Sequence, residues 1–144
     1  MNASVEVVVS NESGLTQQIR SGEHVWYADE PPPFGNDKGP SPYELLLSSL
    51  GACTSMTLQL YAKRKQWDLR QVTVRLKHFR VHADDCMNCE THEGFLDRID
   101  RDLELVGTLD DSQKKRLIEI AERCPVHRTL KSKIDIRTHL TPNK

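Results

Sequence analysis

The stretch SPYELLLSSLGACTSMTLQLYAKRK, residues 41–65, decides the fold of this chain. Its central 18 residues, 45–62, contain no Lys, Arg, Asp, Glu or His. Ser41 is a favourable N-cap and Pro42 suits a first helical turn. The basic run 63–65 is typical of a helix C-terminus. We therefore expect one long, mostly apolar helix that ends near Lys65.

This helix has the minimum length of a membrane span. Seven of its central positions are nevertheless polar or glycine: Ser48, Ser49, Gly51, Thr54, Ser55, Thr57 and Gln59. Polar groups are unfavourable against lipid tails, and small residues in an apolar helix indicate close packing by its neighbours. The sequence predicts a core helix and no membrane association.

The composition is that of a globular chain with a single domain, residues 1–144. Charged residues make up 28% and hydrophobic ones 37%, and the net charge of −1 gives no indication of nucleic-acid binding. No basic region precedes the first apolar run, so we expect no secretory signal. Four cysteines without such a signal favour a reducing, cytoplasmic location.

Periodicity in the rest of the chain predicts an α+β fold with mostly antiparallel sheets enclosing the long central helix. Asp110-x-x-Gln113 is typical of a capping box that opens a second helix, and Pro125 begins a short helix to about Lys131. One small sheet cannot bury the apolar surface of so long a helix, so the sequence predicts a homodimer. Strands are expected at residues 5–10, 15–20, 24–28, 72–81, 99–105 and 134–140.

Cys53 and Cys124 are the candidate reactive groups. Both have apolar helical neighbours, so a buried, inert thiol is the simpler interpretation of each. Cys124 ends the stripe Leu117, Ile120, Ala121, Cys124 and precedes Pro125, so it could instead cap a helix whose amides stabilise a thiolate. Two such thiols could cooperate in oxidation and disulfide closure.

A separate cluster, Cys86-x-x-Cys89 with His82 and His92, supplies the four ligands of a tetrahedral zinc site. A redox dithiol and a plain polar hairpin tip are the other interpretations. The spacing is compact and only one such pair is present, so we assign no metal ligand and no cofactor.

Several motifs together resemble the OsmC/Ohr family, the osmotically induced and organic-hydroperoxide-resistance proteins, in an OsmC-like branch. The resemblance runs from about Gly39 to Leu140 and includes LGAC around Cys53, HADDCMNCET, the acidic strand IDRDLELVG and CPVHRTL from Cys124.

The resemblance implies an intertwined homodimer in which Cys53 is the peroxidatic cysteine and Cys124 the resolving one. Cys53 would reduce a small organic hydroperoxide and become a sulfenic acid, and Cys124 would condense with it. A dithiol reductant would reopen the disulfide. The alternative is a non-catalytic member that binds a small apolar ligand in the dimer groove.

The family's catalytic glutamate lies ten residues before the first cysteine, a place that Tyr43 occupies here. Glu44 follows it, about 100° further around the helix, and is the candidate for that catalytic role. The arginine that pairs with the glutamate in the family has no clear match; Arg20 is the candidate by position.

Overall fold

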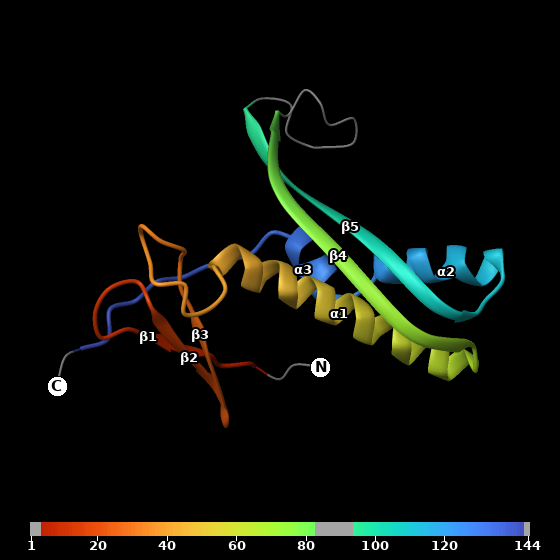
Figure 1. The fold of residues 1–144 in the computed structure, drawn as a ribbon, viewed down its shortest axis with the longest axis horizontal. Helices are drawn as coiled ribbons and strands as arrows, with labels where there is room; N and C mark the ends of the chain where they lie inside the picture. The colour runs from red at the N-terminus through yellow and green to blue at the C-terminus, as the bar shows by residue number, and fades with distance from the viewer. Residues whose placement is uncertain (1–3, 83–93, 143–144) are drawn as a thin grey trace. The chain divides into compact units, whose positions relative to one another are not determined.

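The computed structural model describes residues 4–82 and 94–142 and confirms the α+β class (Figure 1). The chain divides into two compact units, which are described separately: unit 1 comprises residues 1–49 and 78–98, and unit 2 comprises 50–77 and 99–144. The elements in chain order are β1 Val8–Ser10, β2 Gln17–Ser21, β3 His24–Ala28, α1 Pro42–Lys65, β4 Asp68–His82, β5 Phe95–Thr108, α2 Asp111–Ala121 and α3 Pro125–Lys131.

Unit 1 contains the antiparallel sheet β1–β2–β3, in which Ile19 of β2 lies opposite both Val9 and Trp26. The predicted strand 24–28 is confirmed. The predicted strand 5–10 is shorter than expected, because β1 pairs with β2 only from Val8 onward.

Asp29 organises the proline-rich segment that follows this sheet. Its side chain is 2% exposed and accepts hydrogen bonds from the Thr16 hydroxyl at 2.7 Å and from the backbone amides of Glu30, Asn36 and Lys38. These bonds hold the pKa of Asp29 below its usual value, and the bond from Thr16 has the largest effect. One buried carboxylate therefore fixes the loop that leads into α1.

Helix α1 begins with a reciprocal cap. The Ser41 hydroxyl accepts from the Glu44 amide at 3.3 Å, and the Glu44 carboxylate accepts from the Ser41 amide at 3.0 Å. The predicted long helix is confirmed, including its basic last turn. By length and composition α1 could cross a membrane, and core helices of soluble proteins share the same length and composition.

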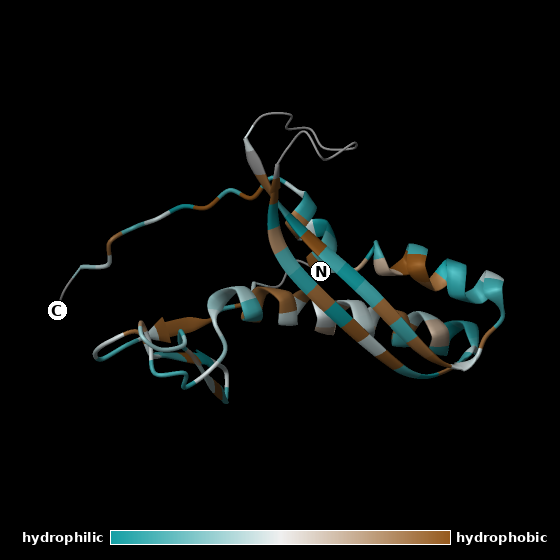
Figure 2. Cartoon of the chain, turned by 45° about the horizontal axis from the view of Figure 1, so that its top comes forward, coloured by the Kyte–Doolittle hydropathy of each residue, from teal (hydrophilic) through white to brown (hydrophobic). Residues whose placement is uncertain are grey.

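Unit 2 is built around a core to which α1, β4 and α2 contribute Leu58, Leu69 and Leu117. Strands β4 and β5 form a two-stranded sheet in which apolar and polar residues alternate (Figure 2). Apolar side chains of this sheet pack against the core. Gly51 permits close contact between α1 and β4, because a Cβ there would lie 2.8 Å from Leu76 Cδ1. Asp110 and Gln113 form the predicted capping box of α2.

The predicted strand at residues 134–140 is wrong. The segment has no strand structure, and Ile136 and Leu140 are 81% and 96% exposed. A strand needs hydrogen-bonding partners for its backbone, and no strand among the described residues of this chain pairs with it. Alternation of apolar residues alone therefore does not make a strand here.

Replacing Leu117 by alanine should destabilise the protein by about 2–5 kcal/mol, because its fully buried side chain would leave a cavity in the core of unit 2. Ile118→Ala, at the neighbouring and 56% exposed position of α2, should stay within about 1 kcal/mol. Chemical denaturation of both variants at equal protein concentration measures the difference. Equal losses would contradict the placement of the core.

Candidate active site

The start of α3 brings the two predicted cysteines together. The backbone amide of Val126 donates to Cys53 Sγ at 3.5 Å, and the next amide, of His127, donates to Cys124 Sγ at 3.3 Å. Both cysteines are free thiols. Two sulfurs 71 positions apart in the sequence are therefore held by consecutive peptide groups.

Local sequence explains this arrangement. Cys124 is the N-cap of α3, with an extended backbone at φ −63° and ψ 144°, and Pro125 occupies the first turn. Amides at a helix start have no partner within the helix, so side-chain acceptors must satisfy them. Cys124 is fully buried at the end of the predicted apolar stripe, whereas Cys53 is half-buried. The more accessible sulfur is thus the one on α1.

Thr54 links α1 to Cys124. Its hydroxyl donates to the Leu50 carbonyl at 2.7 Å and accepts from Arg101 Nη1 at 3.0 Å. Cys124 Sγ lies 3.8 Å from the same oxygen. Because the single hydroxyl proton is already given to Leu50, the Cys124 thiol acts as the donor in this contact. Thr54, itself fully buried, therefore orients the S–H group of Cys124.

Arg101 joins this network to His127. Its Nη2 lies 2.9 Å from His127 Nδ1. A guanidinium can only donate, so Nδ1 is the unprotonated nitrogen and the ring proton sits on Nε2. That nitrogen faces Glu122 Oε2 at 3.6 Å. Within residues 4–82 and 94–142, no carboxylate pairs with Arg101, so its N–H groups point to neutral acceptors in residues that contact Cys124.

The pKa of His127 lies below its ordinary value. Burial is the main cause, and the positive charges of Arg101 and Lys131 add to it, while Glu122 opposes it. The unfolded chain therefore binds more protons at this residue than the folded one. Its contribution to stability is complete above the ordinary pKa of about 6.5 and is lost as the pH falls from there through the folded pKa.

Sequence reasoning missed Arg101 and Thr54. A signal for Arg101 was present: it stands at the same strand parity as Ile99, Leu103 and Leu105, on the half-buried face of β5. A charged residue at an apolar position of a strand is rarely there for packing. Thr54 gave no such signal, because threonine fits the small-residue pattern of the helix.

Three residues considered from the family pattern lie in unit 1, whereas both cysteines lie in unit 2. Glu44 caps α1, and its hydrogen bonds with Ser41 keep its pKa below the usual value. Tyr43 stacks on His78 with ring centroids 4.5 Å apart. Arg20 is exposed on β2 and contacts Gln18 at 3.4 Å. The catalytic role of Glu44 stays a prediction.

The possible zinc ligands Cys86, Cys89 and His92 lie outside the described residues, as does the side chain of His82. Elsewhere in the described part of the chain, no group of three or more His, Cys, Asp or Glu side chains is arranged to hold a metal ion. The zinc interpretation is therefore untested by the structure.

A family model described as OsmC-like protein matches residues 35–139. The chain belongs to the OsmC-like protein family. No curated protein matches it in sequence.

Solved structures share the OsmC-like fold. An OsmC-like protein of Mycoplasma pneumoniae is 23% identical, with a TM-score of 0.74 over 91% of this chain and 89% of that one. The organic hydroperoxide resistance protein OsmC of Legionella pneumophila is 14% identical, with a TM-score of 0.65 over 94% of both chains. For the organic hydroperoxide resistance protein OhrB of Bacillus subtilis the values are 20% and 0.62, over 92% and 94%. At these identities the likeness establishes the fold alone.

Removing the charge of Arg101 should raise the pKa of His127 toward its ordinary value without reaching it, because burial is the larger cause of the depression. The measurement is an NMR titration of the imidazole resonances in wild type and Arg101→Met. The loss of stability on acidification should shrink in parallel. Arg70→Met, an exposed position on β4, is the control. An unchanged His127 titration in Arg101→Met would show that the two side chains are not in contact.

Proposed function

We propose that this OsmC-like protein is a thiol-dependent peroxidase that reduces organic hydroperoxides in oxidative-stress defence. The observation that carries the proposal is the pair of consecutive amides that hold Cys53 and Cys124. A half-buried sulfur is suited to meet a small substrate, and a fully buried one beside it is suited to resolve the product.

The proposed cycle has three balanced steps. The Cys53 thiolate attacks the terminal peroxide oxygen, the O–O bond breaks, and the leaving alkoxide takes a proton to become an alcohol. This oxidises Cys53 to a sulfenic acid. The Cys124 thiol then condenses with it, forming a disulfide and releasing water. A dithiol reductant finally exchanges with the disulfide and leaves as its own oxidised form.

Arg101 supports this chemistry as a positioning residue. It donates to Thr54 and His127, two residues that contact Cys124, so its charge lies close to the sulfur that resolves the sulfenic acid. Both of these acceptors are neutral, and no carboxylate of the described residues pairs with Arg101. Arg101 is thus a candidate for part of the function that the family assigns to an arginine, while Glu44 remains a candidate catalytic carboxylate.

A homodimer is part of the proposal, as is the cytoplasmic location. Met56 is 65% exposed on α1, and Ile136 and Leu140 are almost fully exposed near the C-terminus. Exposed apolar side chains of this size indicate a surface that another chain covers. The same exposed apolar surface on α1 favours the second candidate function, a non-catalytic member that binds a small apolar ligand in a groove of the dimer.

Stoichiometric cumene hydroperoxide should convert wild-type protein to a Cys53–Cys124 disulfide, detected by intact mass and peptide mapping. Cys53→Ser should abolish turnover with a dithiol, because no sulfenic acid can form. Cys124→Ser should stop at a Cys53 sulfenic acid that dimedone traps. The double variant Cys86→Ser/Cys89→Ser is the matched control and should retain turnover. If both thiols stay reduced, the ligand-binding alternative replaces the peroxidase; a Cys86–Cys89 disulfide would move the chemistry to the loop.

Sedimentation velocity should give the mass of a dimer at micromolar concentration. Met56→Lys should shift the protein toward the monomer, because burying an unpaired ammonium in an apolar interface is unfavourable. Wild type that remains monomeric across a wide concentration range would refute the dimer while leaving the thiol chemistry open to its own test.

A further inference from the structure

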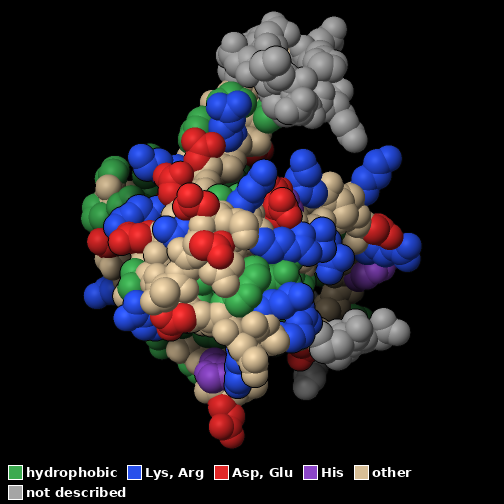
Figure 3. Space-filling model, turned by 90° about the vertical axis from the view of Figure 1, so that its right-hand side faces the viewer, with side chains coloured by type: hydrophobic (Ala, Val, Ile, Leu, Met, Phe, Trp, Pro, Cys, Tyr) green, Lys and Arg blue, Asp and Glu red, His purple; other side chains and the backbone are tan. Residues whose placement is uncertain are grey.

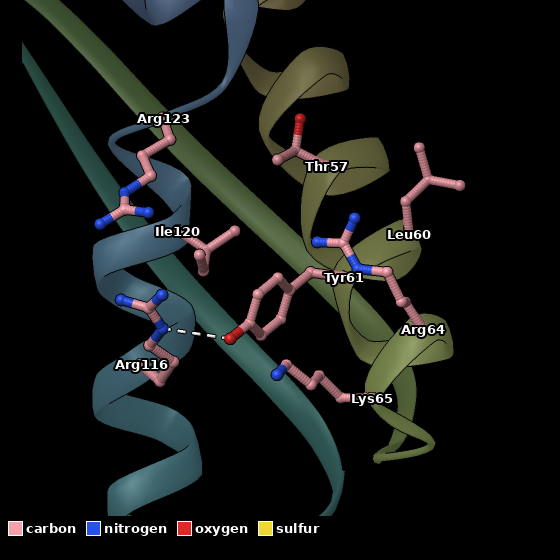
Figure 4. A pocket seen from close by; sticks show the side chains of 8 residues that line it. All are labelled: Thr57, Leu60, Tyr61, Arg64, Lys65, Arg116, Ile120 and Arg123. Atoms are coloured by element: carbon pink, nitrogen blue, oxygen red, sulfur yellow. Dashed lines mark hydrogen bonds between the residues drawn. The ribbon is translucent and has the colours of Figure 1, made fainter.

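A pocket of about 580 Å³ opens in unit 2 between α1 and the end of α2. Its volume is within the range of small-ligand sites. Figure 4 shows its lining: Thr57, Leu60, Tyr61, Arg64 and Lys65 of α1, Arg116 and Ile120 of α2, and Arg123 just beyond α2. Four of these eight side chains are cationic, and none is acidic.

Three of the cations gather around one aromatic ring. The charged groups of Arg64, Lys65 and Arg116 lie 5.6, 5.8 and 5.8 Å from the ring centroid of Tyr61. Arg116 also donates to the Tyr61 hydroxyl at 3.1 Å (Figure 4). That bond, with the positive charges of Arg116, Lys65 and Arg64, lowers the pKa of Tyr61. The pocket therefore has an excess of positive potential that acts on a group within it.

Neutralisation of this charge is incomplete. Glu119 pairs with Arg116 at 2.9 Å, but Arg64, Lys65 and Arg123 make no ion pair with any carboxylate in the described part of the chain. Figure 3 shows Lys and Arg side chains beside hydrophobic surface on one face of the molecule. Gathering like charges without counterions is unfavourable, so the arrangement suits an anion from solution.

We propose that this pocket binds a small organic phosphate monoester. Three uncompensated cations match a dianionic group better than a single carboxylate, and guanidinium groups suit phosphate oxygens because they donate in pairs. Leu60, Ile120 and the methyl group of Thr57 provide an apolar wall for the organic part. The site does not depend on the proposed peroxidase cycle.

Calorimetric titration at low salt tests the proposal, using Cys53→Ser protein so that the proposed peroxidatic thiol cannot contribute. The probes are phenyl phosphate, inorganic phosphate, benzoate and phenol. Phenyl phosphate should bind most tightly, since it alone offers both the dianion and the apolar ring, and its affinity should fall as salt is added. Amide chemical-shift changes should concentrate at residues 57–65 and 116–123.

The double variant Arg64→Gln/Lys65→Gln should weaken phenyl phosphate binding by roughly tenfold or more, because two charge-assisted contacts are lost. Lys63→Gln/Lys115→Gln removes the same charge from exposed positions of α1 and α2 outside the pocket and should bind as before. Equal weakening in both variants, benzoate binding as tight as phenyl phosphate, or no binding would overturn the proposal. The proposal would also be overturned if the protein sedimented with vesicles of phosphatidylcholine and phosphatidic acid but did not bind phenyl phosphate.

Discussion

The candidate active site depends on two backbone amides at the start of α3 that have no acceptor within the helix. Pro125 has no N–H to give, and the amides of Val126 and His127 precede the first internal bonds of the helix. A buried N–H without an acceptor costs about 1–3 kcal/mol, so the fold must place an acceptor at each one. Here both acceptors are sulfur atoms. The same two contacts that cap the helix thus bring the thiols together, and any change in the oxidation state of the sulfurs acts directly on the start of α3.

Arg101 gives this site its electrostatic character. A guanidinium on the half-buried face of β5 needs acceptors, and among the residues that the structure describes these are Thr54 and His127, with no carboxylate paired to it. A carboxylate partner would cancel most of its charge, whereas neutral acceptors satisfy its N–H groups and leave the charge in place. The cost falls on His127, which must stay neutral to accept. Protonation of His127 would replace an attraction by a repulsion and loosen the contact that holds Arg101 beside Cys124.

Local chemistry in the sequence was sufficient to predict α1, the capping box at Asp110 and the short helix after Cys124, because each depends on residues within a few positions of one another. The prediction of a strand at residues 134–140 was wrong, because a strand needs a second strand to pair with and the alternation of residues does not supply one. Joining Cys53 to Cys124 came from a family resemblance, and the amide pair that supports it is a tertiary feature. The position of Arg101 on the half-buried face of β5 can be deduced from the alternation along the strand, but that alternation does not identify the groups that its side chain contacts.

The thiol site and the basic pocket share the same two segments of chain. Thr57 of the pocket is one helical turn, about 6 Å, beyond Cys53, and Arg123 directly precedes Cys124. Both sites therefore depend on how α1 packs against the segment that joins α2 to α3, because Cys53 and Thr57 lie on the first and Arg123 and Cys124 on the second. A change that displaces either segment is expected to disturb the thiol pair and the lining of the pocket together.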